Sequence, residues 1–131
     1  IEVAKKNVDA NCLQNIHCVH SNWFRNIDNL VFDIIVSNPP YISKEDPHLK
    51  QPELIKQPQV ALVSDDEGLQ DIKVIVGNAS EYLRKMGILL IEHGYNQANK
   101  VKQIFTDNKF NHIDQHKDIN NKIRVTSGIK I

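Results

Sequence analysis

The sequence predicts an α/β domain whose sheet is mostly parallel. Two near-continuous apolar runs, residues 31–36 and 88–91, have the composition of buried strands in a parallel sheet. Between these runs, apolar side chains recur at helical spacing from Leu69 to Met86. The order strand, helix, strand is typical of the repeating unit of α/β folds.

Further elements are expected on both sides of this unit. Residues 1–11 have the apolar spacing of the end of a helix, and residues 16–20 form a short run that predicts a strand. Residues 95–108 predict a second amphipathic helix. Residues 112–116 and 122–129 predict two final strands that pair as a hairpin.

The helix expected from Leu69 to Met86 has residues typical of a helix start before it and of a helix end after it. Ser64 and Glu67 have the three-residue spacing of a capping box before its first apolar residue. Gly87 follows Met86 and is expected to end the helix as the glycine after the last helical residue.

The prolines predict one long loop. All five lie between Asn38 and Asp66, at positions 39, 40, 47, 52 and 58. Proline lacks a backbone N–H and restricts φ, so this window is not expected to hold a regular helix or a central strand. A loop of this length in a small domain is usually functional or disordered.

Composition narrows the function classes. The chain has 131 residues, with 16 basic and 16 acidic side chains that give a formal net charge of zero. This balance argues against direct binding to nucleic acid, which needs a basic surface. No apolar run approaches the roughly 18 residues that a membrane span needs, and no signal peptide is visible. The two cysteines, Cys12 and Cys18, make no disulfide framework, so a cytoplasmic location is expected.

The segment Asn38-Pro39-Pro40-Tyr41 follows the first buried run, and ligands of open α/β sheets bind beyond the carboxyl ends of strands. Asn38 offers an amide oxygen, and Pro39 offers a carbonyl with no N–H. The two prolines keep these acceptors at a constant spacing, and the Tyr41 ring could lie against a flat group. The segment therefore suits a planar amino group, that of a glutamine or asparagine amide or of adenine or cytosine. A rigid strand exit without a ligand is the structural alternative.

The acceptor pair also suggests a reaction. An amide nitrogen is a poor nucleophile because its lone pair is delocalised into the carbonyl group. Two acceptors on its hydrogens push electron density towards nitrogen and stabilise the positive charge that grows during attack. Asn38, Pro39 and Tyr41 are therefore the predicted catalytic residues, and no strong base is required before the attack.

Asn38-Pro39-Pro40-Tyr41 resembles the substrate motif of class I S-adenosylmethionine-dependent amino-methyltransferases. Further segments, in order, make the chain similar to the HemK/PrmC family, whose members methylate the glutamine side-chain amide of the Gly-Gly-Gln motif in peptide chain release factors. Ile91-Glu92-His93-Gly94 is the most specific of them. The others are Ser21-Asn22-Trp23-Phe24, Phe32 to Ile42, Asp46-Pro47-His48-Leu49, Ala61-Leu62-Val63, Asp66-Glu67-Gly68-Leu69 and Arg124-Val125-Thr126.

The resemblance implies a Rossmann-like class I methyltransferase fold, with S-adenosyl-L-methionine as the methyl donor and release factors as partners. It implies that Asn38, Pro39, Pro40 and Tyr41 bind the substrate glutamine. It also assigns cofactor binding to three residues, Trp23, Asn22 and Asn38. A core position is the structural alternative for Trp23.

Two residues depart from the family pattern. Asn22 stands where the family usually has Asp, and its amide hydrogens could clash with a donor such as an adenine amino group. Gln57 stands where the family usually has Glu, so that loop lacks the carboxylate of the family pattern.

The resemblance further implies that the fold is incomplete. Residues 1–131 would be the C-terminal portion of a single catalytic domain, without the first two strands and the glycine-rich loop. The strand at Phe32 would then have an unpaired apolar edge, and we expect an oligomer or a strand swap. We also expect weak or no cofactor binding and no turnover by this chain alone.

Two other functions are left open: a nucleic-acid (adenine) amino-methyltransferase with the same acceptor geometry, and a non-catalytic truncated remnant. His93 is either catalytic or shapes the end of its strand. Arg124 lies either near the active site or in a surface ion pair. No metal site is expected, because the spacing of the cysteines and histidines between residues 12 and 20 fits no zinc pattern.

Overall fold

The computed structural model describes residues 1–51 and 56–131, which divide into two compact units, residues 1–30 and 31–131. In the first unit, α1 (Glu2–Ala10) confirms the predicted helix. The rest of this unit consists of turns, and no strand occurs among its residues. The predicted strand at residues 16–20 is therefore wrong. A strand needs a partner, and Ile16 and Val19 remain 45% and 47% exposed.

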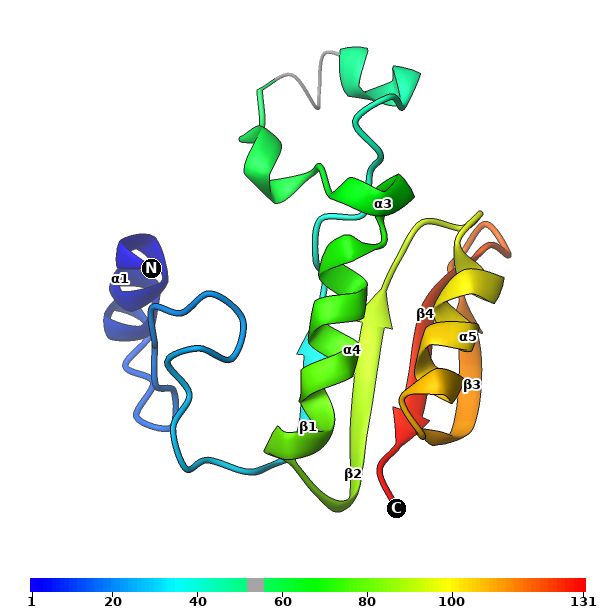
Figure 1. The fold of residues 1–131 in the computed structure, drawn as a ribbon. Helices are drawn as coiled ribbons and strands as arrows, with labels where there is room; N and C mark the ends of the chain where they lie inside the picture. Colours follow the sequence, from blue (N-terminus) through cyan, green and yellow to red (C-terminus); the bar gives the residue numbers. More distant parts are fainter. Residues whose placement is uncertain (52–55) are drawn as a thin grey trace. The chain divides into compact units, whose positions relative to one another are not determined.

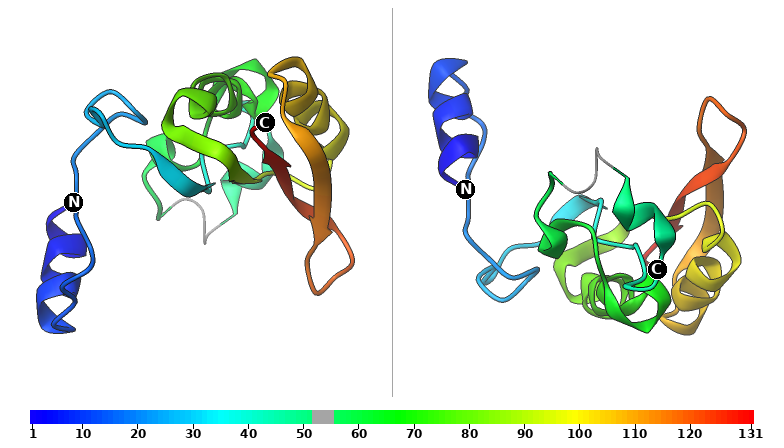
Figure 2. Two further views of the ribbon diagram at one scale, coloured as in Figure 1. Left: turned by 90° about the horizontal axis from the view of Figure 1, so that it is seen from below. Right: turned by 90° about the horizontal axis from the view of Figure 1, so that it is seen from above.

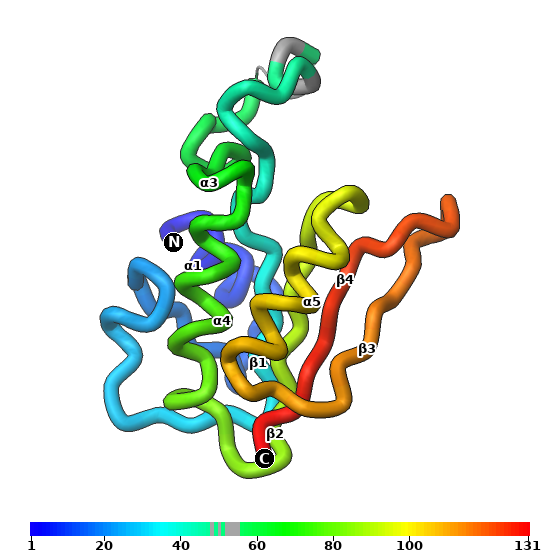
Figure 3. Tube along the Cα trace, turned by 45° about the vertical axis from the view of Figure 1, so that its right-hand side comes forward, coloured from blue at the N-terminus to red at the C-terminus, as the bar shows by residue number. Residues whose placement is uncertain are grey.

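The second unit contains a four-stranded sheet in the order β1-β2-β4-β3. β1 (Phe32–Ser37) runs parallel to β2 (Leu83–Glu92), whereas β4 (Ile123–Ile129) runs antiparallel to β2 and to β3 (Asn111–Lys117). Only one of the three pairings is parallel, so the expectation of a mostly parallel sheet is wrong. The α/β class and the hairpin at the end of the sequence are confirmed, and Figure 3 follows that hairpin from α5 into β3 and back along β4.

Two helices, α4 (Gln70–Tyr82) and α5 (Ala98–Asp107), cover the same face of this sheet (Figures 1 and 2). Both are amphipathic and turn their apolar side chains towards the strands. Phe105 and Phe110 pack with their ring centroids 5.2 Å apart over Gly128 of β4. The fully buried side chains of this core are Ile72, Ile75, Val76, Ala79, Leu83, Leu89, Ile91, Val101 and Phe105.

β1 lies at the edge of the sheet, with an exposed apolar face. Ile35 pairs with Leu89 on the face that the helices cover. Ile34 and Val36 point to the opposite face and are 57% and 72% exposed. The predicted unpaired apolar edge is therefore confirmed among the described residues of the second unit.

The boundary between α4 and β2 lies earlier than predicted. The helix ends at Tyr82, and Leu83 already pairs with Phe32 of β1. The register then jumps, because the next pair joins Ile34 to Ile88, and Met86 adopts a left-handed φ of 67° between them. The predicted helix to Met86 with Gly87 as its terminal residue is therefore wrong. Pairing of the buried Leu83 with β1 overrides the helical spacing.

The start of α4 also differs from the prediction. The Ser64 hydroxyl accepts a hydrogen bond from the Asp71 N–H at 3.1 Å, so it caps α4 from seven residues away. The intervening segment α3 (Asp65–Gly68) is no regular helix, because Asp66 and Glu67 have φ values of 55°. The Glu67 side chain pairs with Lys100 instead of returning to Ser64. The predicted capping box is therefore wrong.

The proline-rich window contains only short turns in its described part. These are η1 (Pro47–Lys50) and η2 (Gln59–Ala61), besides one bridge between Ile42 and Val63. This agrees with the predicted loop, of which residues 52–55 lie outside the described residues. In the part of the chain that the structure describes, no helix has the length and hydropathy to cross a membrane.

Candidate active site

The sheet places two sequence motifs at one edge. β1 and β2 are parallel, with Ser37 opposite Ile91, so their carboxyl ends lie side by side. Asn38 to Tyr41 leave the end of β1, and Glu92 and His93 lie at the end of β2. This is the edge where ligands bind in open α/β sheets.

The two predicted hydrogen-bond acceptors have no partner among the described residues, but they differ in exposure. Asn38 is exposed, whereas Pro39 is fully buried and anchors the turn. Among the described residues, neither the Asn38 side chain nor the Pro39 carbonyl has a hydrogen-bond partner. The exposed Asn38 amide oxygen is thus available to a ligand, whereas the Pro39 carbonyl has no partner but belongs to a residue that is covered in this structure.

Tyr41 joins the motif to β2. Its hydroxyl donates a hydrogen bond to Glu92 Oε1 at 3.2 Å. Burial, and then the neighbouring Glu92 carboxylate, raise the pKa of Tyr41, while the charge of Arg124 opposes this shift. The phenol therefore stays protonated at neutral pH, and the hydrogen bond holds the ring in place.

His93 connects the end of β2 to β4. It is 0% exposed, and its Nδ1 lies 2.9 Å from the Gly94 carbonyl oxygen, which can only accept a hydrogen bond. Nδ1 therefore carries the proton, and Nε2 accepts from the Thr126 hydroxyl at 2.9 Å. Burial lowers the pKa of His93, so the ring is neutral. With both nitrogens engaged, this geometry supports the interpretation that His93 shapes the strand end.

Arg124 fits both interpretations of its role. Its Nε donates to Asp118 Oδ2 at 3.2 Å, and its guanidinium lies 5.6 Å from the centre of the Tyr95 ring. The backbone N–H of His93 donates to the Arg124 carbonyl at 2.9 Å, which places Arg124 beside the end of β2. Hydrogen bonds, first from the backbone N–H of Lys122 and then from Arg124, lower the pKa of Asp118.

The structure adds one residue that sequence reasoning missed. Gln97 is buried beside the motif, and its side-chain amide bonds to the backbone of three segments, at Tyr41, Glu67 and Gly94. In the sequence, Gln97 is a neutral polar residue that lies between Gly94, which follows a strand, and Ala98, which begins a helix. This local pattern does not show that Gln97 bonds to Tyr41 and Glu67.

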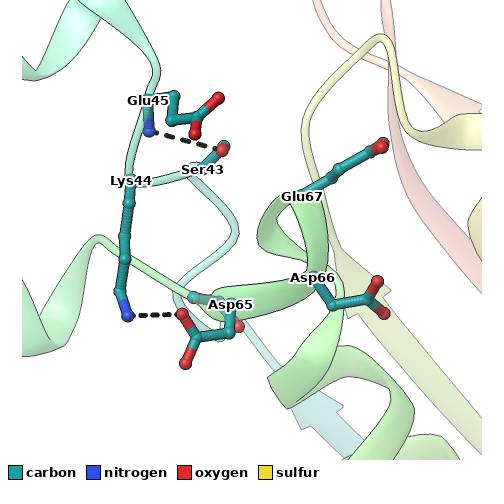
Figure 4. Close-up of a pocket in the computed structure, with 7 residues that line it drawn as sticks. Ser43, Lys44, Glu45, Asp65, Asp66 and Glu67 are labelled. Atoms are coloured by element: carbon teal, nitrogen blue, oxygen red, sulfur yellow. Dashed lines mark hydrogen bonds and ion pairs between the residues drawn. The ribbon is translucent and has the colours of Figure 1, made fainter.

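A separate pocket of about 240 Å³ lies between the start of the loop and α3, lined by Ser43, Lys44, Glu45, Ser64, Asp65, Asp66 and Glu67 (Figure 4). Each acidic side chain of α3 is paired with a lysine: Asp65 with Lys44, Asp66 with Lys73 and Glu67 with Lys100. These are exposed ion pairs of small energetic value. None of the residues from Asn38 to Tyr41 lines this pocket.

The predicted cofactor residues Asn22 and Trp23 belong to the first unit. Asn22 is exposed and its carbonyl accepts the Arg25 N–H at 3.1 Å, so a turn carries the half-buried Trp23 at a φ of 51°. The positions of both residues are known only within the first unit, and their role in cofactor binding remains a prediction. Gln57 is exposed in the proline-rich loop.

Solved structures share the fold at low sequence identity. A ribosomal protein L11 methylase from Lactobacillus delbrueckii subsp. bulgaricus aligns with a TM-score of 0.67 at 17% identity, covering 99% of this chain and 53% of that chain. A methyltransferase from Pyrococcus furiosus aligns with a TM-score of 0.62 at 14% identity, covering 98% and 56%. The fold is therefore that of a Rossmann-like class I methyltransferase, present in part.

Sequence comparison narrows this class. The family model described as "Methyltransferase small domain" matches residues 1–126, and the chain belongs to that family. Curated relatives confirm the predicted HemK/PrmC resemblance. They are release factor glutamine methyltransferases from Francisella tularensis (41% identical), Haemophilus influenzae (42%) and Escherichia coli (37%), and 96% to 98% of this chain is covered. The chain spans only 43% to 46% of the length of these relatives.

Proposed function

We propose that the protein transfers a methyl group from S-adenosylmethionine to the side-chain amide nitrogen of the glutamine in the Gly-Gly-Gln motif of peptide chain release factors. The observation that carries this proposal is the pair of acceptors without a partner at the end of β1, the exposed Asn38 side chain and the buried Pro39 carbonyl. The release factor is suggested by the names of the relatives, and the acceptor pair suits the amide of its glutamine.

The acceptor pair would bind both hydrogens of the substrate amide. Asn38 is exposed and open to a ligand, whereas Pro39 is buried, so its carbonyl would have to be uncovered to accept the second hydrogen. The hydrogen bond from Tyr41 to Glu92 holds the aromatic ring beside them. A planar amide held in this way loses orientational freedom before it reacts.

S-adenosylmethionine would supply an electrophilic methyl group. The residues of this chain that would face it are Asn38 and, by the family resemblance, Asn22 and Trp23. The two acceptors would stabilise positive charge as it develops on the amide nitrogen, with no reorganisation during the reaction. The proton would leave to water afterwards, because both ring nitrogens of the buried His93 already have hydrogen-bond partners within the chain.

An exocyclic amino group of adenine has the same donor pattern as an amide, so the acceptor geometry alone also suits a nucleic-acid substrate. The formal net charge of zero favours the protein substrate, because nucleic-acid binding relies on an excess of basic side chains.

The test uses the complete gene product that contains this sequence. It is incubated with S-adenosylmethionine and either a purified release factor or adenine-containing DNA, and the products are mapped by mass spectrometry. We expect one added methyl group on the glutamine of the Gly-Gly-Gln motif and none on DNA. Methylation of adenine, or an unmodified release factor at high enzyme concentration, would contradict the proposal.

A further inference from the structure

Gln97 joins three segments of the chain around the candidate site. It lies at the start of α5 and is 7% exposed. Its Oε1 accepts the Gly94 N–H at 2.9 Å, and its Nε2 donates to the carbonyl oxygens of Tyr41 and Glu67, each at 3.0 Å. We call these three bonds the Gln97 clamp. It ties the end of β2, the Asn-Pro-Pro-Tyr turn and α3 to one side chain.

The partners of the clamp define the orientation of the amide. The Gly94 N–H can only donate, and the two carbonyl groups can only accept. A flipped amide would set donor against donor and oxygen against oxygen. A carboxylate at this position would keep the bond to Gly94 but lose both bonds to the carbonyl groups of Tyr41 and Glu67.

The same carbonyl of Tyr41 is held from other sides. A Cβ added to Gly68 would lie 2.1 Å from this oxygen, and Gly68 has a φ of +81°, so only a glycine fits beneath it. The next residue, Ile42, donates its N–H to the Leu62 carbonyl at 2.9 Å and accepts from the Ser64 N–H at 3.0 Å. The backbone that follows the Asn-Pro-Pro-Tyr turn is therefore fixed by hydrogen bonds at both the N–H and the carbonyl group of Ile42.

We propose that Gln97 is a positioning residue for the acceptor pair of Asn38 and Pro39. Gln97 holds the backbone at Tyr41. The φ angles of Pro40 and Pro39 are nearly fixed, so a restraint at Tyr41 also limits the position of the Pro39 carbonyl and of Asn38 before it. Gln97 touches no reacting atom. The role assigned to the acceptor pair rests on the proposed function, whereas the clamp itself can be tested without it.

The first test measures amide hydrogen exchange by NMR in this chain and in two variants of similar side-chain length, Gln97→Glu and Gln97→Met. In Gln97→Glu we expect the amides of Ile42 and Ser64 to exchange about fivefold to tenfold faster, since each lost hydrogen bond is worth about 1 kcal/mol. The Gly94 amide should stay protected, because a carboxylate still accepts its hydrogen. In Gln97→Met, all three amides should exchange faster.

Two controls separate the clamp from general destabilisation. Gln103→Glu makes the same chemical change on the exposed face of α5 and should leave all three amides unchanged. The Val101 amide, which bonds to the backbone carbonyl of Gln97, should also keep its exchange rate. Wild-type exchange of Ile42 and Ser64 in both Gln97 variants would overturn the inference.

The second test measures methyl transfer by the complete gene product. We expect Gln97→Glu to lower kcat by about 10-fold to 100-fold, because small displacements of a reacting group cost this much, with little change in KM for the release factor. An active wild type with unchanged kcat in the variant would overturn the inference and leave the proposed function intact. An inactive wild type would instead overturn the proposed function, and the exchange test would still decide whether the clamp exists.

Discussion

The Tyr41 hydroxyl donates a hydrogen bond to Glu92 Oε1 at 3.2 Å, so the ring that follows the double proline is tied to the end of the neighbouring strand. We expect Tyr41→Phe to lower the free energy of unfolding by about 1 kcal/mol, since it leaves a half-buried carboxylate without this partner. Urea unfolding measures the change.

The matched control is Tyr95→Phe. Tyr95 is 55% exposed, and its hydroxyl has no hydrogen-bond partner in the part of the chain that the structure describes. Removing that hydroxyl should leave the stability nearly unchanged. An equal loss in both variants would show that the bond between Tyr41 and Glu92 contributes nothing specific.

The buried His93 predicts a dependence of stability on pH. Burial lowers the pKa of His93 in the folded state below its ordinary value of 6.5. Between these two pKa values the unfolded chain therefore binds more protons than the folded chain. The stability that depends on a neutral His93 is fully present above pH 6.5 and is lost as the pH falls towards the folded-state pKa. We expect wild-type protein to lose more stability on acidification from about pH 7.5 to about pH 5 than His93→Gln does.

Urea titrations at each pH measure this difference. His17→Gln removes an exposed histidine of the first unit and should keep the wild-type slope. Identical slopes for wild type and His93→Gln would mean that His93 binds its proton equally well in the folded and unfolded states, which would contradict the lowered pKa.

Two glycines should respond to alanine in opposite directions. A Cβ on Gly128 would lie 2.7 Å from Phe105 Cδ1 and 3.0 Å from Phe110 Cβ, so Gly128→Ala should overpack the core and cost about 1–3 kcal/mol. In exposed Gly77 of α4, the nearest atom would be 3.7 Å away, and Gly77→Ala should stabilise by about 0.5–1 kcal/mol. Thermal unfolding compares them, and a stabilising Gly128→Ala would contradict the packing between α5 and β4.

The exposed edge of β1 predicts self-association of this chain. Ile34 and Val36 present apolar side chains on a strand that has only one neighbour among the described residues. Light scattering should show a mass that rises with concentration, and Val36→Lys should reduce it. Val60→Lys, at an 82% exposed position outside the sheet, is the control and should change nothing. A monomeric wild type at high concentration would contradict this prediction.

Local sequence signals predicted the parts of the fold that depend on short-range patterns. The buried run at residues 88–91, the amphipathic α5 and the final hairpin all follow from the spacing of apolar residues. The Asn-Pro-Pro-Tyr motif also pointed to the end of β1, because its residue types carry their own chemistry.

Elements that depend on distant partners could not be predicted in this way. The helical spacing continues to Met86, but Leu83 pairs with Phe32, which a local pattern does not contain. The segment at residues 16–20 has the composition of a strand but no neighbour to pair with in its unit. Gln97 contacts Tyr41, far away in the sequence, and only the fold brings them together.

The central claim is that Asn38 and Pro39 hold the amide nitrogen that is methylated, and substitution of Asn38 tests it most directly. In the complete gene product, we expect Asn38→Ala to slow methylation of the release factor glutamine by about 100-fold or more, which is typical when one preorganised electrostatic partner is removed. Asn38→Asp, which keeps an acceptor oxygen, should retain more activity than Asn38→Ala. Methylation at the wild-type rate in Asn38→Ala would contradict the account.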